Sequence, residues 1–482
     1  MLGTWTGAIA LGLASLLWVE LVRDVYHVLA HAWPPLYRLH VWHHRVFRRD
    51  LTPVSLEIYR RAHWYNDVPE ALVMLASSSL PPSLALALAW PHPGVAALGS
   101  LYTLTFLLGA IARGSGLAYA DELTDLTHRP GEFQQLPGRW QVNRPYHWRH
   151  HFDNQQAYYC GTITLVDKLM GTALSLTGKR IAVTGASGAL GRALLYHLKA
   201  RGARVIALTS QPEPIYLADG SQPWRTLTWR VGDEAALATE LEAIDILILN
   251  HGINVHGDRD ATAIERSYAV NAFSQWRLLE LFLTTVRDNA AKATKEVWVN
   301  TSEAEVSPAF SPLYELSKRT LGDLVTLRRL EAPCILRKLI LGPFKSSLNP
   351  IGVLSADWVA QQVVNLAVRD TRNIIVTINP LTYVAFPLKE LAVSFYYRCF
   401  TRPTPPAPPR LADVAALGAV PAPAAQRHSP GLAAGRPLGL APSGAMAGSL
   451  HQRLPSLGPG NLSPALATAG SGGGARPERD RR

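Results

Sequence analysis

The sequence predicts an all-α transmembrane helical domain, then an α/β domain with a doubly wound parallel sheet, and finally a disordered C-terminal tail. Long apolar segments fill the first part of the chain, a glycine-rich turn begins shortly after residue 178, and no aromatic residue follows residue 401. The 482 residues exceed one ordinary domain, because a domain usually holds about 150 residues. The predicted domains are residues 1–175, 176–400 and 401–482.

Two apolar regions predict the membrane-embedded helices. Residues 5–22 are apolar apart from one glutamate and are long enough for one crossing, without the basic region and cleavage site of a signal peptide. Between Glu70 and Arg113, 42 residues contain no Asp, Glu, Lys or Arg, with a PHPG turn at residues 91–94. This pattern predicts a helical hairpin whose first arm is interrupted at residues 81–82; buried helices of a large soluble core are the alternative. Arginines flank both ends, so the positive-inside rule places these ends in the cytoplasm.

Composition narrows the classes of partner. The formal net charge is +11 at pH 7, but residues 401–482 alone hold nine arginines and three acidic residues. No Lys/Arg stripe interleaves with aromatic residues, so we expect no nucleic-acid partner. The tail is rich in Pro, Ala, Gly and Arg and cannot bury enough apolar surface to fold; an out-of-frame or recently acquired extension has such a composition too. Three widely separated cysteines, Cys160, Cys334 and Cys399, indicate a reducing compartment.

Histidine is concentrated in the first half, where 11 of the 16 histidines fall within the first 151 residues. They form HxxxH at residues 27–31 and HxxHH at residues 40–44 and 147–151, with a further histidine at 128. Positions i, i+3 and i+4 share one helical face, so each HxxHH brings three imidazoles within metal-bridging reach. Eight or nine imidazoles exceed the needs of one tetrahedral zinc, so two metal ions are predicted. The predicted ligands are His27, His31, His40, His43, His44, His128, His147, His150 and His151.

Other polar residues lie beside these clusters. His63 is expected to be a ligand or to lie next to one, whereas His92 is expected to have no role. We expect Asp24, Asp125 and Asp153 to orient imidazoles by accepting hydrogen bonds. The zinc-peptidase motif HExxH is absent, which argues against hydrolysis.

Three segments carry a resemblance to a known superfamily: DVYHVLAH, LYRLHVWHH and YHWRHHFDNQQAYYCGTITLVDKLMGT. They closely resemble the fatty acid hydroxylase/sterol desaturase superfamily over roughly residues 20–173. The resemblance implies an integral, multi-pass membrane enzyme with two non-haem iron ions at the cytoplasmic face, which uses O2 and two electrons to hydroxylate or desaturate a lipid. His128 matches the histidine that the superfamily places before its last cluster; a partner four residues away would fall on Thr124 or Glu132. The chain holds no ferredoxin-like cysteines and no haem motif, so an external donor such as a ferredoxin or a cytochrome b5-like protein is implied.

The sequence TGASGALG at residues 184–191 follows a predicted strand and opens a predicted helix, which is the context of a Rossmann-type dinucleotide site. Small residues let the backbone approach a pyrophosphate at the helix N-terminus. Residues 208–211 end the second strand without an acid, so NADP(H) is preferred over NAD(H). Residues 381–400 are aromatic-rich and fit either a membrane-interface helix or a packed C-terminal helix. Further strands of the doubly wound sheet are expected at residues 244–249, 296–300, 335–340 and 373–378.

Tyr314 and Lys318 share a helical face, where the ammonium can lower the pKa of a phenol that is about 10 in water and let it act as an acid or base. With residues 250–252, Asn271 and Ser302, this pair resembles the short-chain dehydrogenase/reductase family over roughly residues 178–380. The resemblance implies that Tyr314 is the proton donor or acceptor and that Lys318 binds the ribose. It also implies that Ser302 orients the substrate oxygen and that Asn271 supports a proton relay. The predicted cofactor-binding residues are Gly185, Ser187, Gly188, Gly191, Asn250, Gly252 and Lys318.

Three features depart from the pattern of that family. The glycine spacing is GxxGxxG rather than GxxxGxG, His251 stands in a segment that is usually NAG-like, and Ser302 precedes Tyr314 by one residue less than is typical.

The order of the two halves resembles the bifunctional sterol desaturase/short-chain dehydrogenase proteins of cyanobacteria. We therefore expect a bifunctional membrane oxidoreductase that hydroxylates or desaturates a sterol-, fatty acyl- or carotenoid-like lipid and interconverts an alcohol with a ketone. The short connection at residues 174–179 is expected to keep both sites at one membrane face. Two alternatives stay open: an oxygenase whose reductase half only holds nucleotide, and a membrane-anchored nucleotide-binding sensor or scaffold with structural zinc.

Overall fold

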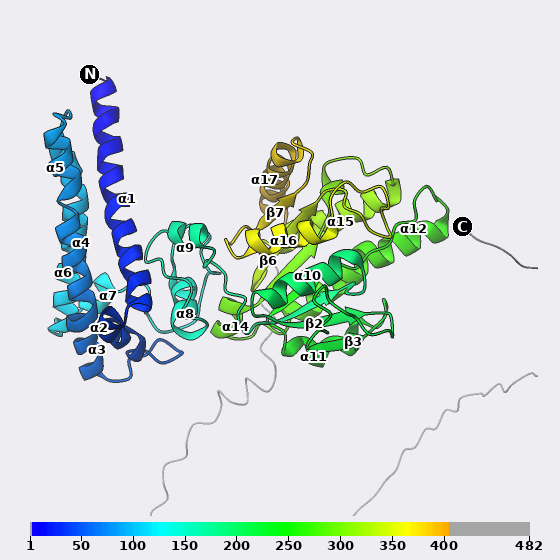
Figure 1. The fold of residues 1–482 in the computed structure, drawn as a ribbon, viewed down its shortest axis with the longest axis horizontal. Helices are drawn as coiled ribbons and strands as arrows, with labels where there is room; N and C mark the ends of the chain where they lie inside the picture. Colours follow the sequence, from blue (N-terminus) through cyan, green and yellow to red (C-terminus); the bar gives the residue numbers. More distant parts are fainter. Residues whose placement is uncertain (1, 404–482) are drawn as a thin grey trace, which may run out of the picture. The chain divides into compact units, whose positions relative to one another are not determined.

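A computed structural model describes residues 2–403 (Figure 1). The predicted order of a helical region and then a Rossmann-type sheet is confirmed. The predicted disordered tail lies outside the described residues from residue 404 on. The predicted domain boundary at residues 175–176 stays a prediction; it falls between the last helix of the first half and the first strand.

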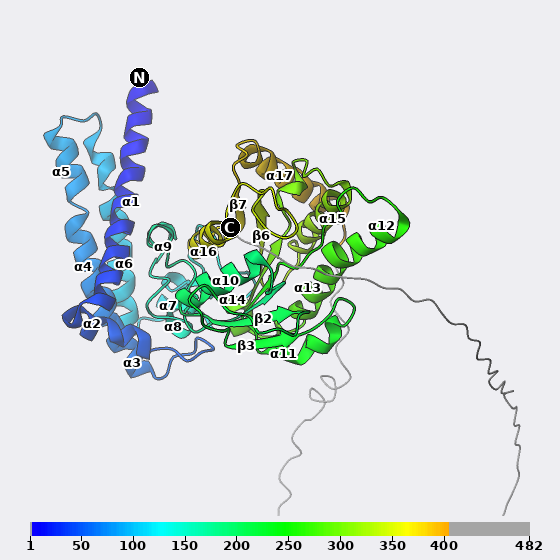
Figure 2. The ribbon, with the colours of Figure 1, turned by 45° about the vertical axis from the view of Figure 1, so that its right-hand side comes forward.

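The first half is helical: α1, α4 and α6 run beside one another, and α5 continues the direction of α4 (Figures 1 and 2). Three stretches are long and apolar enough to cross a membrane: Trp5–Ala32, Leu56–Ala87 and Pro93–Gly114. The elements are α1 (Leu2–Ala32), α2 (Pro34–Arg45), α3 (Leu56–Ala62), the π-helix η1 (His63–Asp67), α4 (Val68–Ser77), α5 (Leu80–Ala87), the 3-10 helix η2 (Pro93–Ala97), α6 (Leu98–Gly114), α7 (Ala120–Thr124), α8 (Arg144–Phe152) and α9 (Leu165–Met170).

Sequence details explain how this helical group is built. The predicted interruption is present, because α4 ends at Ser77 and the two prolines stand in the first turn of α5, where a missing N–H costs little. Helices α1 and α6 touch at Gly99, whose N–H donates to Ser15 Oγ at 3.1 Å. A Cβ at Gly99 would lie 2.7 Å from the Ser15 carbonyl oxygen. Small residues thus let the two backbones approach closely, as membrane helices do.

The second half is a seven-stranded sheet in the order β3-β2-β1-β4-β5-β6-β7, and every pairing is parallel. The strands are β1 (Arg180–Thr184), β2 (Arg204–Thr209), β3 (Arg225–Thr228), β4 (Ile246–Leu249), β5 (Glu296–Asn300), β6 (Ile335–Leu341) and β7 (Asn373–Val376). The helices are α10 (Ala189–Ala200), η3 (Glu234–Leu237), α11 (Ala238–Glu242), α12 (Ala261–Tyr268), the π-helix η4 (Ala269–Ser274), α13 (Gln275–Leu283), α14 (Asn289–Thr294), η5 (Glu303–Glu305), α15 (Pro312–Arg328), α16 (Ala356–Ala367) and α17 (Thr382–Phe400).

Two apolar cores cover the two faces of the sheet. Helices α10 and α16 contribute to one core, and α11, α13 and α15 contribute to the other. The central strands are buried on both faces, so they appear in the sequence as continuous apolar runs. Edge strand β3 is mostly exposed and has no such run, which is why it was not predicted.

The predicted strand ends shift by up to two residues. Strand β4 begins at Ile246 rather than at 244, because Ile244 N–H still closes the turn after α11 by donating to the Leu241 carbonyl. Strand β6 continues to Leu341, and β7 ends at Val376, the last residue that pairs with β6.

A fully buried ionic network joins helix α8 to the sheet. Arg337 Nε and Nη2 donate to the two carboxylate oxygens of Glu296 at 2.7 and 2.9 Å, and Nη2 also lies 2.7 Å from Asp370 Oδ1. Arg149 of α8 donates from Nε to the Ala293 carbonyl at 2.5 Å and lies 3.5 Å from Glu296. The helix with the last histidine cluster is therefore anchored to the edge where β5 begins.

Replacing the shared cation of this network should destabilise the protein strongly. Arg337→Leu is expected to lower the free energy of unfolding by about 3–5 kcal/mol, because two buried carboxylates, Glu296 and Asp370, would lose their nearest cation. Arg225→Ala removes a solvent-exposed pair with Glu240 and should change it by less than about 1 kcal/mol. Denaturant unfolding of both variants in detergent measures this difference; similar small losses would show that the buried network contributes little.

Candidate active sites

A sharp turn after β1 begins the nucleotide site. Gly185 has φ of +63°, and a Cβ there would lie 2.9 Å from His251 Cα. A Cβ at Gly191 would lie 2.2 Å from the Gly185 carbonyl oxygen. Both positions therefore require glycine. The turn lets α10 start close to the sheet, with Gly188 as its N-cap, so the helix N-terminus and its free N–H groups can face a pyrophosphate.

A cavity of about 1020 Å³ opens at the carboxyl ends of the strands, where parallel α/β sheets bind ligands. The seven predicted cofactor-binding residues line this cavity together with Tyr314 and Ser302, whereas Asn271 does not line it. The residues present thus fit a dinucleotide, with the glycine turn at one end and the tyrosine at the other.

Tyr314 and Lys318 lie on α15, and Ser302 follows β5 with an unusual φ of +74°. Lys318 Nζ donates to the Asn300 carbonyl at 2.7 Å and lies 5.9 Å from the centre of the Tyr314 ring. Burial lowers the pKa of Lys318 to about 7. Burial also raises the pKa of Tyr314, against a smaller lowering by its hydrogen bond with Ser302. Because desolvation is the largest influence, the net direction of the Tyr314 pKa is upward, and the expected lowering by Lys318 stays a prediction.

Asn271 holds a loop instead of lining the cavity. Its Oδ1 accepts from Ile253 N–H at 2.8 Å, and its Nδ2 donates to the Ile253 carbonyl at 3.0 Å and to Ser317 Oγ at 3.1 Å. The asparagine therefore fixes the segment after β4 against the helix that carries Tyr314. Its predicted part in a proton relay stays a prediction.

The unusual His251 has a structural explanation. Its Nδ1 lies 2.9 Å from Thr184 Oγ1 and its Nε2 lies 3.2 Å from Ser274 Oγ, which ties β1 to η4. Burial lowers the pKa of His251 to about 3, so the imidazole is neutral. Sequence reasoning missed Arg230, which lines the cavity directly after β3. A basic residue after a strand is a detectable signal, but β3 itself was not predicted.

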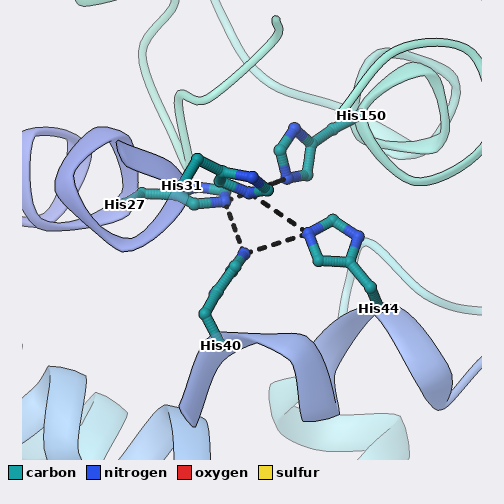
Figure 3. Close-up of side chains that lie close together, drawn as sticks. All are labelled: His27, His31, His40, His44 and His150. Carbon is teal, nitrogen blue, oxygen red and sulfur yellow. Dashed lines mark hydrogen bonds between the residues drawn. The ribbon is translucent and has the colours of Figure 1, made fainter. Parts of the chain in front are cut away.

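Nine histidines of the first half form two groups, and all nine are the predicted ligands. The first group combines His27 and His31 of α1, His40 and His44 of α2, and His150 of α8 (Figure 3). Their Nε2 atoms converge: His27 lies 3.1 Å from His40 and 3.0 Å from His150, and His44 lies 3.0 Å from His40 and 3.2 Å from His31. The second group consists of His43, His128, His147 and His151.

The hydrogen-bond partners of the first group indicate a cation at its centre. His27 Nδ1 lies 2.6 Å from the Tyr159 carbonyl and His150 Nδ1 lies 2.8 Å from the Ala157 carbonyl. A carbonyl only accepts, so each Nδ1 carries the proton and each Nε2 presents a lone pair. These two lone pairs face each other at 3.0 Å and repel. A metal ion between them removes the repulsion, so the group fits a metal.

In the second group the imidazole nitrogens also converge. His151 Nε2 lies 3.1 Å from His147 Nε2 and 3.3 Å from His128 Nε2, while His128 Nδ1 lies 2.9 Å from Asp125 Oδ1. Burial, with smaller contributions from neighbouring imidazoles, holds the pKa of His43, His147 and His151 well below the usual value. Neutral imidazoles are the form that binds metals.

The predicted orienting carboxylates are correct only in part. Asp125 contacts His128 as expected, but Asp24 accepts from Gly161 N–H at 3.0 Å and Asp153 pairs with Lys179 at 2.5 Å. Backbone carbonyls orient His27 and His150 in their place, because the loop after α8 folds back over the cluster.

A chain of hydrogen bonds that the sequence did not predict orients His40 of the first group. His40 Nδ1 donates to Asn66 Oδ1 at 2.8 Å, and Asn66 Nδ2 donates to Asp67 at 2.7 Å. His63 belongs to neither group, since its Nδ1 pairs with Asp67 at 2.6 Å. His92 stacks on Trp5 at 4.9 Å, away from the clusters.

Comparisons with known proteins follow this division of the chain. Residues 179–333 match the family model of the short chain dehydrogenases. The aldohexose dehydrogenase of Thermoplasma acidophilum is 18% identical, covers 42% of this chain and 94% of its own, and has a TM-score of 0.35. A short chain dehydrogenase from Burkholderia cenocepacia in complex with NADP is 21% identical, covers 48% and 100%, and has a TM-score of 0.38.

A much more similar relative spans both halves. The monoglucosyldiacylglycerol epimerase of Synechocystis sp. is 63% identical over 404 residues, which are 83% of this chain and 98% of the relative. The chain belongs to the family of this epimerase. The predicted short-chain dehydrogenase/reductase domain is confirmed. The chain is an oxidoreductase of that class, with a nicotinamide nucleotide as its implied cofactor. The resemblance of residues 20–173 to hydroxylases and desaturases, and the iron that it implies, stay predictions.

Proposed function

We propose that the second half epimerises the sugar of a glucosylated diacylglycerol lipid at one carbon that bears a hydroxyl group. The carrying observation is the 63% identity to an enzyme of that name over 98% of its length. The cavity supports the proposal, because it brings an alcohol-handling pair, Tyr314 and Ser302, to one end of a predicted dinucleotide site. We further propose that residues 176–400 carry this activity and residues 1–175 the membrane anchor.

The protein's part in the reaction is to hold an oxygen and to move its proton. A bound nicotinamide nucleotide would take a hydride from the carbinol carbon and return it to the other face of the resulting ketone. Tyr314 takes the hydroxyl proton as the ketone forms and gives it back at the end. Ser302 holds the same oxygen in both steps, and Lys318 binds the ribose. Hydride and proton are both returned, so the reaction consumes no oxidant.

Inversion also requires the ketone to turn between the two hydride transfers. A cavity of about 1020 Å³ is at the upper end of the usual range for ligand sites, which leaves room for a hexose beside the nucleotide. The rotation therefore needs no dissociation from the protein.

An isotope experiment tests this function. The full chain in proteoliposomes receives monoglucosyldiacylglycerol, deuterated in turn at each secondary carbinol of the sugar, with NADP+ or NAD+. We expect an epimeric hexose that keeps the deuterium at the inverted carbon, with no net reduction of nucleotide. Deuterium lost to water, or no epimer despite bound nucleotide, would overturn the proposal.

We propose NADP(H) as the preferred cofactor, because Arg230 supplies a cation in the cavity and residues 208–211 supply no acid. Arg230→Ala should weaken NADP(H) binding about 10–100-fold, since a hydrogen bond to a charged group contributes about 1.5–3 kcal/mol. Binding of NAD(H), which lacks the ribose phosphate, should change little. Titration of intrinsic fluorescence measures both constants; an equal loss for both nucleotides would contradict this role.

We propose a second activity for the first half: a di-iron centre that hydroxylates or desaturates a lipid. The supporting observation is the convergence of ring nitrogens in the two histidine groups, with facing lone pairs of His27 and His150 in the first. Two irons with O2 and electrons from an external donor, such as a ferredoxin or a cytochrome b5-like protein, would supply attack on a C–H bond. The histidines would hold the metals through neutral imidazoles, which suit iron and leave positions open.

We also propose an orientation in the membrane. In this proposal the chain is a multi-pass membrane protein whose hairpin ends, histidine groups and second half lie in the cytoplasm. Three candidate spans and the arginine-rich flanks of the hairpin support it. Protease protection of the reductase half in inverted and right-side-out vesicles tests this; protection in the inverted ones would reverse the orientation.

A further inference from the structure

Helix α17 presents an apolar surface outward. Its outward side chains are between 51% and 75% exposed. Residues three and four apart lie on one helical face, so most of these side chains form one continuous stripe. The stripe and its flanks consist of Leu381, Tyr383, Val384, Leu388, Leu391, Phe395, Tyr396 and Phe400.

Two charged side chains of α17, Lys389 and Glu390, point inward. Glu390 pairs with Arg329 at 2.7 Å and with Lys338 at 2.8 Å, both in the body of the second half. Lys389 pairs with Glu305 at 2.9 Å and with Asp323 at 2.8 Å. A surface helix of a soluble protein turns its apolar stripe inward and its charges to water. Because α17 exposes its apolar stripe instead, contact of its outer face with water is unfavourable.

The apolar surface extends toward the mouth of the cavity. Phe310, Ile351 and Val353 line the cavity and are 97%, 88% and 68% exposed. The start of α17 contacts the lining of the same cavity, since Thr382 Oγ1 donates at 2.5 Å to Glu303, which lines it. Large exposed apolar side chains at a cavity are typical of a binding face.

We propose that α17 and the three mouth residues form a surface that rests in a lipid bilayer, so that the cavity opens onto the membrane. The occupant is a bilayer because the same chain carries three helices that can span one. Tyr383, Tyr396 and Arg398 also give α17 the aromatic and basic flank typical of interfacial helices. Resting on the proposed function, this surface lets a sugar headgroup enter the cavity while the acyl chains stay in the bilayer.

A natural cysteine allows a direct test in the full chain. Cys399 is exposed on α17, in line with Leu388 and Phe395, whereas Cys160 and Cys334 are buried. An environment-sensitive fluorophore on Cys399, in proteoliposomes that contain acyl-chain spin-labelled lipids, should be quenched and blue-shifted. As a control, the fluorophore is moved to Ile264→Cys in a Cys399→Ser chain, because Ile264 is an exposed apolar residue of α12 that does not line the cavity. That label should stay unquenched.

The quenching result does not depend on the lipid substrate, so it stands even if the epimerase proposal fails. An unquenched label at Cys399, or energy transfer between labelled copies without lipid quenching, would overturn the membrane contact; the second outcome would assign the surface to a second copy of the chain.

A kinetic arm then tests the consequence for substrate entry. Leu388→Glu/Phe395→Glu should lower epimerisation of bilayer-embedded glucolipid about tenfold or more, since charges on the apolar face oppose insertion. Turnover of a water-soluble alkyl glucoside and nucleotide binding should be unchanged. Equal loss with both substrates would contradict a role in lipid entry.

Discussion

Tyr314→Phe is expected to lower kcat for alcohol-ketone interconversion by about a thousandfold, the range that a positioned acid or base contributes. The substitution removes one oxygen from a half-buried ring and leaves the glycine turn, where the nucleotide is expected to bind, unchanged. The dissociation constant of the nicotinamide nucleotide, measured by fluorescence titration, should therefore change by less than about twofold. A tenfold change would correspond to about 1.4 kcal/mol. Measured together, the two readouts separate a lost proton carrier from a lost binding site.

Two variants make this prediction specific. Tyr216→Phe alters an exposed tyrosine outside the cavity lining and should have no effect on either readout. Ser302→Ala should lower kcat less than Tyr314→Phe does, because the serine holds the oxygen without carrying its proton. If Tyr314→Phe retains a tenth of the activity or more, another group moves the proton and the assignment is wrong.

Local spacing explains why so much of the dehydrogenase half was predictable. The glycine turn, the Tyr314/Lys318 pair and the apolar central strands each lie within a few residues, so their geometry follows from one helix or strand. The roles of Arg230 and Asn271 were harder to predict. Arg230 reaches the cavity because it follows β3, an exposed edge strand without an apolar run. Asn271 holds a loop that is 18 residues away in the sequence.

The histidine motifs show a limit of the same reasoning. The HxxHH motif predicts three imidazoles together, but α2 sends His40 and His44 to the first group and His43 to the second. Positions i+3 and i+4 lie about 60° before and about 40° beyond position i, so they diverge by about 100°. On α8 the first and last histidines of the motif serve the second group, and His150 serves the first. The two motifs interlock, which spacing alone does not reveal.

Helix α17 illustrates a second limit. Its sequence fitted a membrane-interface helix and a packed helix equally well, because an apolar stripe is the same pattern in both cases. The orientation of α17 depends on Lys389 and Glu390, whose partners include the buried Lys338 of β6 and Glu305 of η5. Only the tertiary structure shows that charged residues face inward.

Metal analysis of histidine variants should give the other large effect. We expect about two iron ions per purified chain, because two separate groups of five and four imidazoles each bring their ligand atoms within 4.8 Å of one another. His27→Ala/His150→Ala should leave about one iron, and His147→Ala/His151→Ala should also leave about one, since each pair belongs to one group. His150→Ala/His151→Ala removes one ligand from each group and should lose both metals. Elemental mass spectrometry on detergent-purified protein measures these numbers.

The choice of metal decides between the oxygenase and the scaffold. His197→Ala is the matched control, because His197 lies on α10 with Asp357 as its partner and should keep both metals. Iron that is lost in the paired variants, with O2-dependent modification of a lipid, supports the second proposed activity.

Zinc in the same ratio, without a lipid product, assigns the histidines to a structural centre that ties α1 and α2 to α8. Because Arg149 anchors α8 to the sheet, loss of zinc should then lower the unfolding temperature of the dehydrogenase half as well. No histidine-dependent metal at all would contradict both readings, since facing lone pairs at 3.0 Å need a cation between them.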